Sequence, residues 1–148
     1  MATYKGKFTP DNPNKYMGDV ENIIYRSGWE RRAMKYFDNT PGVVKWASEE
    51  VVIPYYDSVS KKVRRYFPDF LIKVQTAEGS TQTHLIEVKP SKDLRPPVGG
   101  RGKKKSTVLY EMKTYRMNQD KFAAARKWCD DRNIIWDVWT EKQLKQKG

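Results

Sequence analysis

The stretch 68–89 constrains the fold more than any other part of the sequence. It holds two runs rich in apolar residues, 68–74 and 85–89, separated by a polar segment around Gly79. Short apolar runs on either side of a glycine-containing polar segment predict two β-strands joined by a turn. Pro90 stops the second strand, because proline cannot donate a ladder hydrogen bond. The chain must therefore accommodate an antiparallel hairpin here.

The flanking sequence predicts helices and further strands. Ser27 and Glu30 stand in the Ser-x-x-Glu relation of a capping box, which opens a helix that ends at Pro41-Gly42. A second helix is expected from 107 to 131, either unbroken or restarting with Asn118 as its N-cap. Strands are expected at 43–46, 51–56, 63–74, 83–89 and 134–139. The last helix and strand imply a parallel crossover, so the predicted fold class is α/β, with a mixed β-sheet flanked by helices.

Composition divides the chain into an arm, a domain and one loop. Residues 1–19 read as a basic N-terminal arm, which either lies along DNA or another protein or packs on its own domain. Residues 20–148 read as a single domain. Within it, residues 92–106 contain two prolines, three glycines and six cations against one acid, which predicts a mobile basic loop.

Charge points to the kind of partner. Lys and Arg total 29 against 18 acids, a net charge of +11, which predicts nucleic acid as the partner rather than a membrane. There is no apolar run near 18 residues, so no membrane span is expected. The single Cys129 excludes an internal disulfide and fits synthesis in a reducing compartment. The oligomeric state is left open.

The predicted hairpin carries a set of side chains suited to phosphodiester chemistry. Glu87 and Lys89 are two residues apart and so share one face of their strand, while Asp69 lies on the neighbouring strand about 4.8 Å away if the register pairs them. Two carboxylates suit Mg²⁺, for which Mn²⁺ is a substitute, and the ion can polarise a phosphate and acidify a bound water. Lys89 can orient that water or neutralise charge on the phosphate. The pattern predicts a metal-dependent enzyme that hydrolyses DNA.

Plainer explanations exist for each of these residues. Glu-x-Lys on a strand is commonly a solvated ion pair, and Pro-Asp-Phe commonly starts a strand. Capping fully explains Glu30, and His84 is near the acids but a lone histidine is seldom a ligand. The basic loop leaves directly from the acid-bearing strand, which favours a role in gripping phosphates. The cations expected to contact DNA are Arg95, Arg101, Lys103, Lys104 and Lys105.

Together these residues resemble the PD-(D/E)XK nuclease superfamily. Pro68-Asp69 and Glu87-Val88-Lys89 follow a helix that contains Glu30, in the superfamily's order of helix, three-strand meander, helix and strand. The resemblance implies a restriction-endonuclease-like core, Mg²⁺ held by Asp69 and Glu87, and catalysis by Lys89. Many members add a glutamate from the first helix, which implies that Glu30 is a further ligand as well as a cap.

Longer segments resemble the head completion nucleases of contractile-tailed bacteriophages. They include 24–30, 46–50, 65–70 and 139–141, and the resemblance runs nearly end to end. It implies a virion protein of the head–tail joining region, made in the host cytoplasm. It would cut or trim packaged double-stranded DNA at the portal vertex, with portal and neck proteins as partners. Two alternatives stay open: a structural virion protein that binds DNA or the portal without cutting, and an endonuclease of the transposon-end type.

Overall fold

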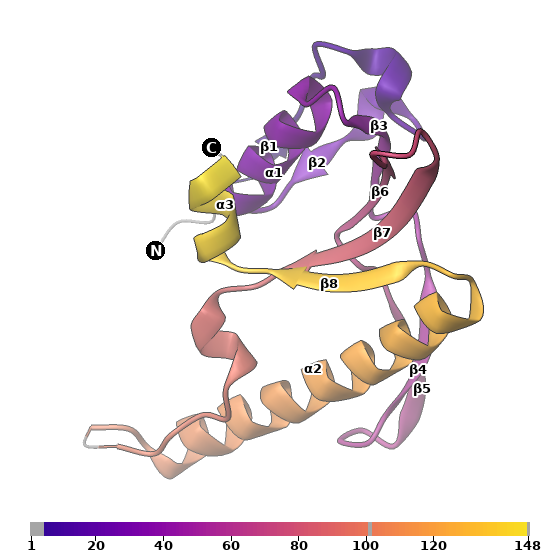
Figure 1. The fold of residues 1–148 in the computed structure, drawn as a ribbon. Helices are drawn as coiled ribbons and strands as arrows, with labels where there is room; N and C mark the ends of the chain where they lie inside the picture. The colour runs from indigo at the N-terminus through magenta and orange to yellow at the C-terminus, as the bar shows by residue number, and fades with distance from the viewer. Residues whose placement is uncertain (1–4, 101, 148) are drawn as a thin grey trace.

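A four-stranded mixed sheet forms the centre of the molecule. The computed structural model describes residues 5–100 and 102–147, and the strand order in its main sheet is β3-β6-β7-β8 (Figure 1). β7 pairs antiparallel with β6 and parallel with β8, so the crossover predicted from the sequence is present. The bounds of these strands are β3 Val43–Ser48, β6 Phe70–Gln75, β7 Thr81–Val88 and β8 Ile135–Trp139.

Helices cover both faces of this sheet, and each face has its own hydrophobic core. α1 (Gly28–Asn39) and α3 (Glu141–Lys147) lie on one side, and α2 (Lys105–Asp131) lies on the other with the hairpin of β4 (Ile53–Asp57) and β5 (Lys62–Tyr66). The core under α1 contains Phe37, Trp46, Phe70, Ile72, Ile86 and Leu144 among others. The core under α2 contains Ile53, Tyr55, Tyr66, Leu85, Ala125 and Cys129. The mixed α/β architecture is the one that the sequence predicts.

The remaining elements are short. They are β1 (Gly6–Lys7), β2 (Ile24–Tyr25) and three 3₁₀ turns at Pro13–Lys15, Val20–Asn22 and Ser91–Leu94. β1 pairs antiparallel with β2 beside α1.

The single long strand expected at 63–74 is wrong, because the chain changes sheets in the middle of it. β5 ends at Tyr66 and pairs with β4, whereas β6 begins at Phe70 and pairs with β3 and β7. The break falls at Pro68, which is fully buried and has no N–H to offer a ladder. Asp69 therefore sits at the point where the chain passes from one sheet to the other.

The N-terminal segment packs on its own domain from residue 5 onward. Phe8 and Tyr16 are 7% exposed and contact the buried ring of Trp46. Lys15 Nζ donates to three carbonyls at the end of α1, and the Asp38 carboxylate accepts from the backbone N–H groups of residues 11 and 12. A cation is stabilised at this end of a helix by the helix dipole. Of the two alternatives for the N-terminal arm, the contacts of residues 5–19 match the one in which it packs on its own domain; residues 1–4 lie outside the described residues.

α2 is one continuous helix of 27 residues. Asn118 lies inside it and does not start a second helix. The basic loop is shorter than 92–106, because Lys105 and Ser106 already belong to α2. All the buried residues of α2 fall at or after Asn118, and its first half reaches beyond the sheet together with the loop before it (Figure 1).

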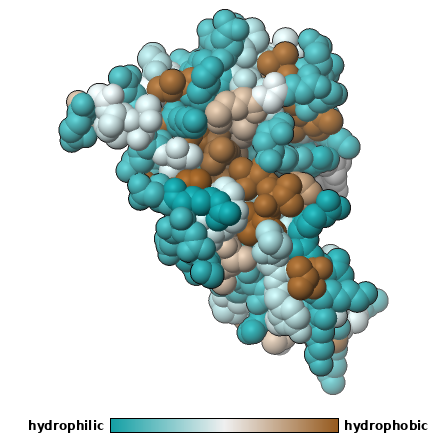
Figure 2. Space-filling view, turned by 90° about the vertical axis from the view of Figure 1, so that its right-hand side faces the viewer, coloured by the Kyte–Doolittle hydropathy of each residue, from teal (hydrophilic) through white to brown (hydrophobic). Residues whose placement is uncertain are grey.

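The face shown in Figure 2 is mostly hydrophilic, with apolar residues gathered near its middle. Among the described residues, no helix has both the length and the apolar character needed to span a membrane.

Candidate active site

The β6–β7 hairpin places Asp69 directly across from Glu87. Phe70 pairs with Ile86 in an antiparallel register. Asp69, one residue before Phe70, therefore lies opposite Glu87, one residue after Ile86. The backbone N–H of Asp69 donates to Glu87 Oε1 at 3.3 Å, and the backbone N–H of Val88 donates to Asp69 Oδ2 at 2.7 Å. These two bonds fix both carboxylates at the open end of the hairpin, opposite its turn.

Glu87 connects this pair to Lys89. Lys89 Nζ lies 3.7 Å from Glu87 Oε2, as expected for residues on one strand face. Glu87 is only 6% exposed, and its Oε1 also accepts a hydrogen bond of 2.7 Å from the Tyr66 hydroxyl. Since three donors surround it, the buried carboxylate is held in one orientation.

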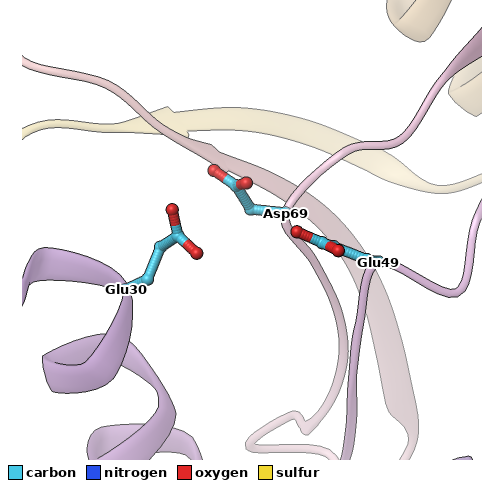
Figure 3. Close-up of side chains that lie close together, drawn as sticks. All are labelled: Glu30, Glu49 and Asp69. Atoms are coloured by element: carbon cyan, nitrogen blue, oxygen red, sulfur yellow. The ribbon is translucent and has the colours of Figure 1, made fainter. Parts of the chain in front are cut away.

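Asp69 also belongs to a group of three carboxylates. Glu30 on α1, Glu49 just after β3 and Asp69 each offer one oxygen, and these oxygens lie within 4.8 Å of one another (Figure 3). Three oxygen donors that converge in this way can hold a divalent cation. Among the described residues this trio does not include Glu87, whose Oε1 is already taken by two donors.

Local structure explains how Glu30 and Glu49 reach the trio. The Glu30 backbone N–H donates to Ser27 Oγ at 3.1 Å, which confirms the predicted cap. In a capping box the Glu30 carboxylate would accept a second bond from the backbone N–H of Ser27. Here the donor is instead the backbone N–H of Arg26, which lies 3.1 Å from Glu30 Oε1. Glu49 has a positive φ of 55°, which turns its side chain towards Asp69, and its backbone N–H donates to the Asp69 carbonyl. Arg26 Nε holds the Glu49 carboxylate at 2.9 Å.

The electrostatics favour a positive charge between these acids. Burial raises the pKa of Asp69 well above its ordinary value, and the neighbouring carboxylates of Glu87 and Glu30 raise it further. Burial also raises the pKa of Glu30 and of Glu87. Acids that are crowded and desolvated favour either a proton or a bound cation. The donor set therefore fits a hard divalent metal ion.

Two residues that lie near the acids are not among the site residues predicted from the sequence. Lys121 on α2 lies with its Nζ 5.6 Å from the centre of the Tyr66 ring, and burial lowers the pKa of its ammonium group. Tyr66 itself is buried, and burial beside Glu87 raises the pKa of its phenol. A positional signal exists only for Tyr66, which stands just before Phe67-Pro68-Asp69.

The other predicted residues divide into those near the site and those away from it. His84 is three residues before Glu87, so it points to the opposite face of β7, where it contacts Gln82. Arg95 and Lys103 line a groove that also contains Lys89. Lys104 is the N-cap of α2 and Lys105 its first residue, and Arg101 lies outside the described residues.

Comparisons with known proteins identify relatives of this chain. A family model described as "TnsA-like endonuclease N terminal" matches residues 40–141, which include Glu49, Asp69, Glu87 and Lys89. The head completion nuclease of Enterobacteria phage T4 is 37% identical over 148 residues, covering 98% of this chain and 96% of that protein. No solved structure matches significantly.

Both matches are to nucleases, which confirms the enzyme class predicted from the sequence. The family match also confirms the predicted restriction-endonuclease-like fold, with its mixed sheet between helices. The matched residues cover more than half of the chain and all of the main sheet. The chain therefore belongs to the family of TnsA-like endonuclease domains.

Proposed function

We propose that this protein is a Mg²⁺-dependent DNA nuclease that acts in phage head completion. The observation that carries the proposal is the convergence of Glu30, Glu49 and Asp69 within 4.8 Å, next to the Glu87–Lys89 pair. The similarity to the T4 head completion nuclease supports the phage role. In this role the protein cuts or trims packaged DNA at the portal vertex so that heads and tails join. It is made in the host cytoplasm, enters the virion at the head–tail joining region and meets portal and neck proteins there.

Glu30, Glu49 and Asp69 are the residues that would hold the metal. Carboxylate oxygens are the ligands that Mg²⁺ prefers, and Mn²⁺ accepts the same set. When bound, such an ion supplies charge that polarises a phosphate and acidifies a water molecule. Glu49 extends the set of ligands predicted from the sequence, which consisted of Asp69 and Glu87 with Glu30.

The protein's own side chains prepare the rest of the reaction. Lys89 brings a positive charge to the open side of the acids, where it can stabilise charge that builds up on the phosphate. Glu87 keeps the Lys89 ammonium group in place, and Tyr66 keeps Glu87 in place. Glu87 is thus assigned a positioning role, and its role as a metal ligand stays a prediction.

A nicking assay tests the proposal. Purified protein is incubated with supercoiled plasmid and Mg²⁺, alongside Asp69→Ala and Lys89→Ala. The matched controls are Glu78→Ala and Lys73→Ala, which change exposed residues of the same hairpin. Both site variants should lose at least about a hundredfold in rate, the scale of losing one preorganised electrostatic group, while the controls nick like the wild type. Equal nicking by all five proteins would refute the proposal.

The excess of positive charge supports one competing function, a structural virion protein that binds DNA without cutting. That function predicts salt-sensitive DNA binding that is indifferent to metal and to Asp69→Ala. Complementation of a phage that lacks the gene separates the two. Restored head–tail joining by the Asp69→Ala protein would favour the structural role. An enzyme of the transposon-end type would require cutting confined to particular ends, which the plasmid assay also reveals.

A further inference from the structure

A groove runs from the active site along the first half of α2. It has a volume of about 570 Å³ and lies between the segment after β7 and the helix. Its floor and walls combine cations with aromatic rings. The residues that matter for its chemistry are Lys89, Lys92, Arg95, Lys103, Tyr110 and Tyr115.

The groove and the candidate active site share one side chain, Lys89. The same side chain lines the groove and lies 3.7 Å from Glu87 Oε2. A ligand that fills the groove therefore contacts Lys89, whose ammonium group lies next to Glu87. The shared side chain indicates that the groove binds a part of the substrate rather than an unrelated small molecule.

Most of the first half of α2, which forms one wall, packs in neither core; Met117, near its end, is partly buried against the core under α2. None of its residues before Asn118 is buried, and Tyr110 is 71% exposed. Tyr110 and Tyr115 both line the groove. The first half of α2 reaches beyond the sheet (Figure 1). Exposed aromatic side chains that pack in no core commonly form binding sites, and nucleic-acid bases stack well on them.

The charge of the lining suits a phosphate backbone. Lys103 Nζ is paired with Glu111 at 2.9 Å, so the charge of that acid is compensated. Lys89 is likewise paired with Glu87, and of the remaining charged residues in the lining, Lys92 and Arg95 outnumber the single acid Asp93. A positively charged channel with stacking platforms is the usual design of sites for single-stranded nucleic acid.

We propose that this groove binds an unpaired stretch of DNA that leads into the active site. A volume of this size is typical of small-ligand sites, so it has room for one or two nucleotides of one strand and not for a duplex. The substrate class that follows is DNA with a single-stranded segment next to the cut, such as a tailed or frayed end. This inference rests on the proposed nuclease function and narrows its substrate.

Binding is tested without metal, so that no cutting occurs. Fluorescence anisotropy in EDTA measures the affinity for a labelled twelve-residue oligothymidylate and for a blunt duplex of the same length. The variants are Tyr110→Ala and Arg95→Ala. The control is Tyr56→Ala, which removes a tyrosine that is 58% exposed on β4, outside the groove. Circular dichroism should show unchanged melting for all three, because all three side chains are exposed.

Loss of one stacking platform should weaken oligothymidylate binding by about 5- to 150-fold, with little change for the duplex. Arg95→Ala should weaken it less and lower its salt dependence, and Tyr56→Ala should change neither affinity. Unchanged oligothymidylate binding in Tyr110→Ala would overturn the proposal. So would an equal loss of affinity for the duplex and for the single strand.

A cleavage assay separates this inference from the proposed function. The wild type should cut a duplex with a single-stranded tail faster than a blunt duplex, and Tyr110→Ala should remove that preference while it keeps blunt-end cutting. Protein that binds oligothymidylate through Tyr110 yet cuts no DNA would refute the nuclease function alone. Cutting that shows no preference for tails would refute the groove proposal alone.

Discussion

The hydrogen bond from Tyr66 to Glu87 should stabilise the fold measurably, and Tyr66→Phe removes it without changing the packing of the ring. Tyr66 is 4% exposed, and its hydroxyl donates to a buried carboxylate at 2.7 Å. Glu87 keeps the Asp69 N–H and Lys89 as partners, so the loss is that of one charge-assisted bond, about 1–3 kcal/mol. For a chain of this size, that lowers the Tm by about 2–12 °C.

Thermal and urea unfolding followed by circular dichroism in EDTA at pH 8 measure this effect. The matched control is Tyr56→Phe, because Tyr56 lies in the same hairpin and is 58% exposed. The control should stay within about 0.5 kcal/mol of the wild type, as surface changes usually do. An equal, small effect of both changes would refute the assigned role of Tyr66.

The pH dependence gives a second check on the same bond. Burial raises the pKa of Glu87 in the folded state above the ordinary value of a glutamate. The folded protein therefore binds the Glu87 proton more tightly than the unfolded chain does. The stability of the fold falls as the pH rises from the ordinary pKa through the raised one. Tyr66 stabilises the ionised form and offsets part of that loss. The difference in stability between wild type and Tyr66→Phe should therefore be largest at pH 8 and shrink as the pH is lowered towards 5. A constant difference would mean that the hydroxyl does not act on the carboxylate.

Three further changes test other parts of the structure. Burial and acidic neighbours raise the pKa of Asp69, so its ionised form destabilises the metal-free fold at neutral pH. Asp69→Asn should therefore raise the Tm in EDTA at pH 8, an advantage that disappears at low pH, and added Mn²⁺ should raise the Tm of the wild type but not of this variant. Ser27→Ala removes the N-cap of α1 and should cost about 1 kcal/mol in urea unfolding. Asp38→Ala leaves two backbone N–H groups of the N-terminal segment without their acceptor, so unfolding should be easier by about 2–4 kcal/mol and limited proteolysis should cleave that segment first.

The hairpin half of the site follows from local rules. Alternation along a strand puts Glu87 and Lys89 on one face, and the short turn at Gly79 fixes the register that brings Asp69 across from Glu87. The cap formed by Ser27 and the helix that carries Glu30 follow equally from spacing. These features depend on residues close in sequence, which is why sequence patterns predict them.

The other half depends on contacts that no local pattern encodes. Glu49 reaches Asp69 only because β3 pairs with β6 over a long separation and because its own φ is positive. The strand expected at 63–74 is interrupted because Pro68 is buried between two sheets, although proline in a strand is itself a warning. Lys121 approaches Tyr66 through the docking of α2, which is a tertiary arrangement.

The two cores on opposite faces of the sheet mean that no single layer of the molecule contains the whole site. Glu30 is anchored by the layer with α1, whereas Tyr66, which orients Glu87, is anchored by the layer with α2. From the roles proposed above for these residues, we expect a nascent or partly denatured chain in which either layer is unfolded to lack part of the site and not to cut DNA. This arrangement would confine DNA cutting to the fully folded protein.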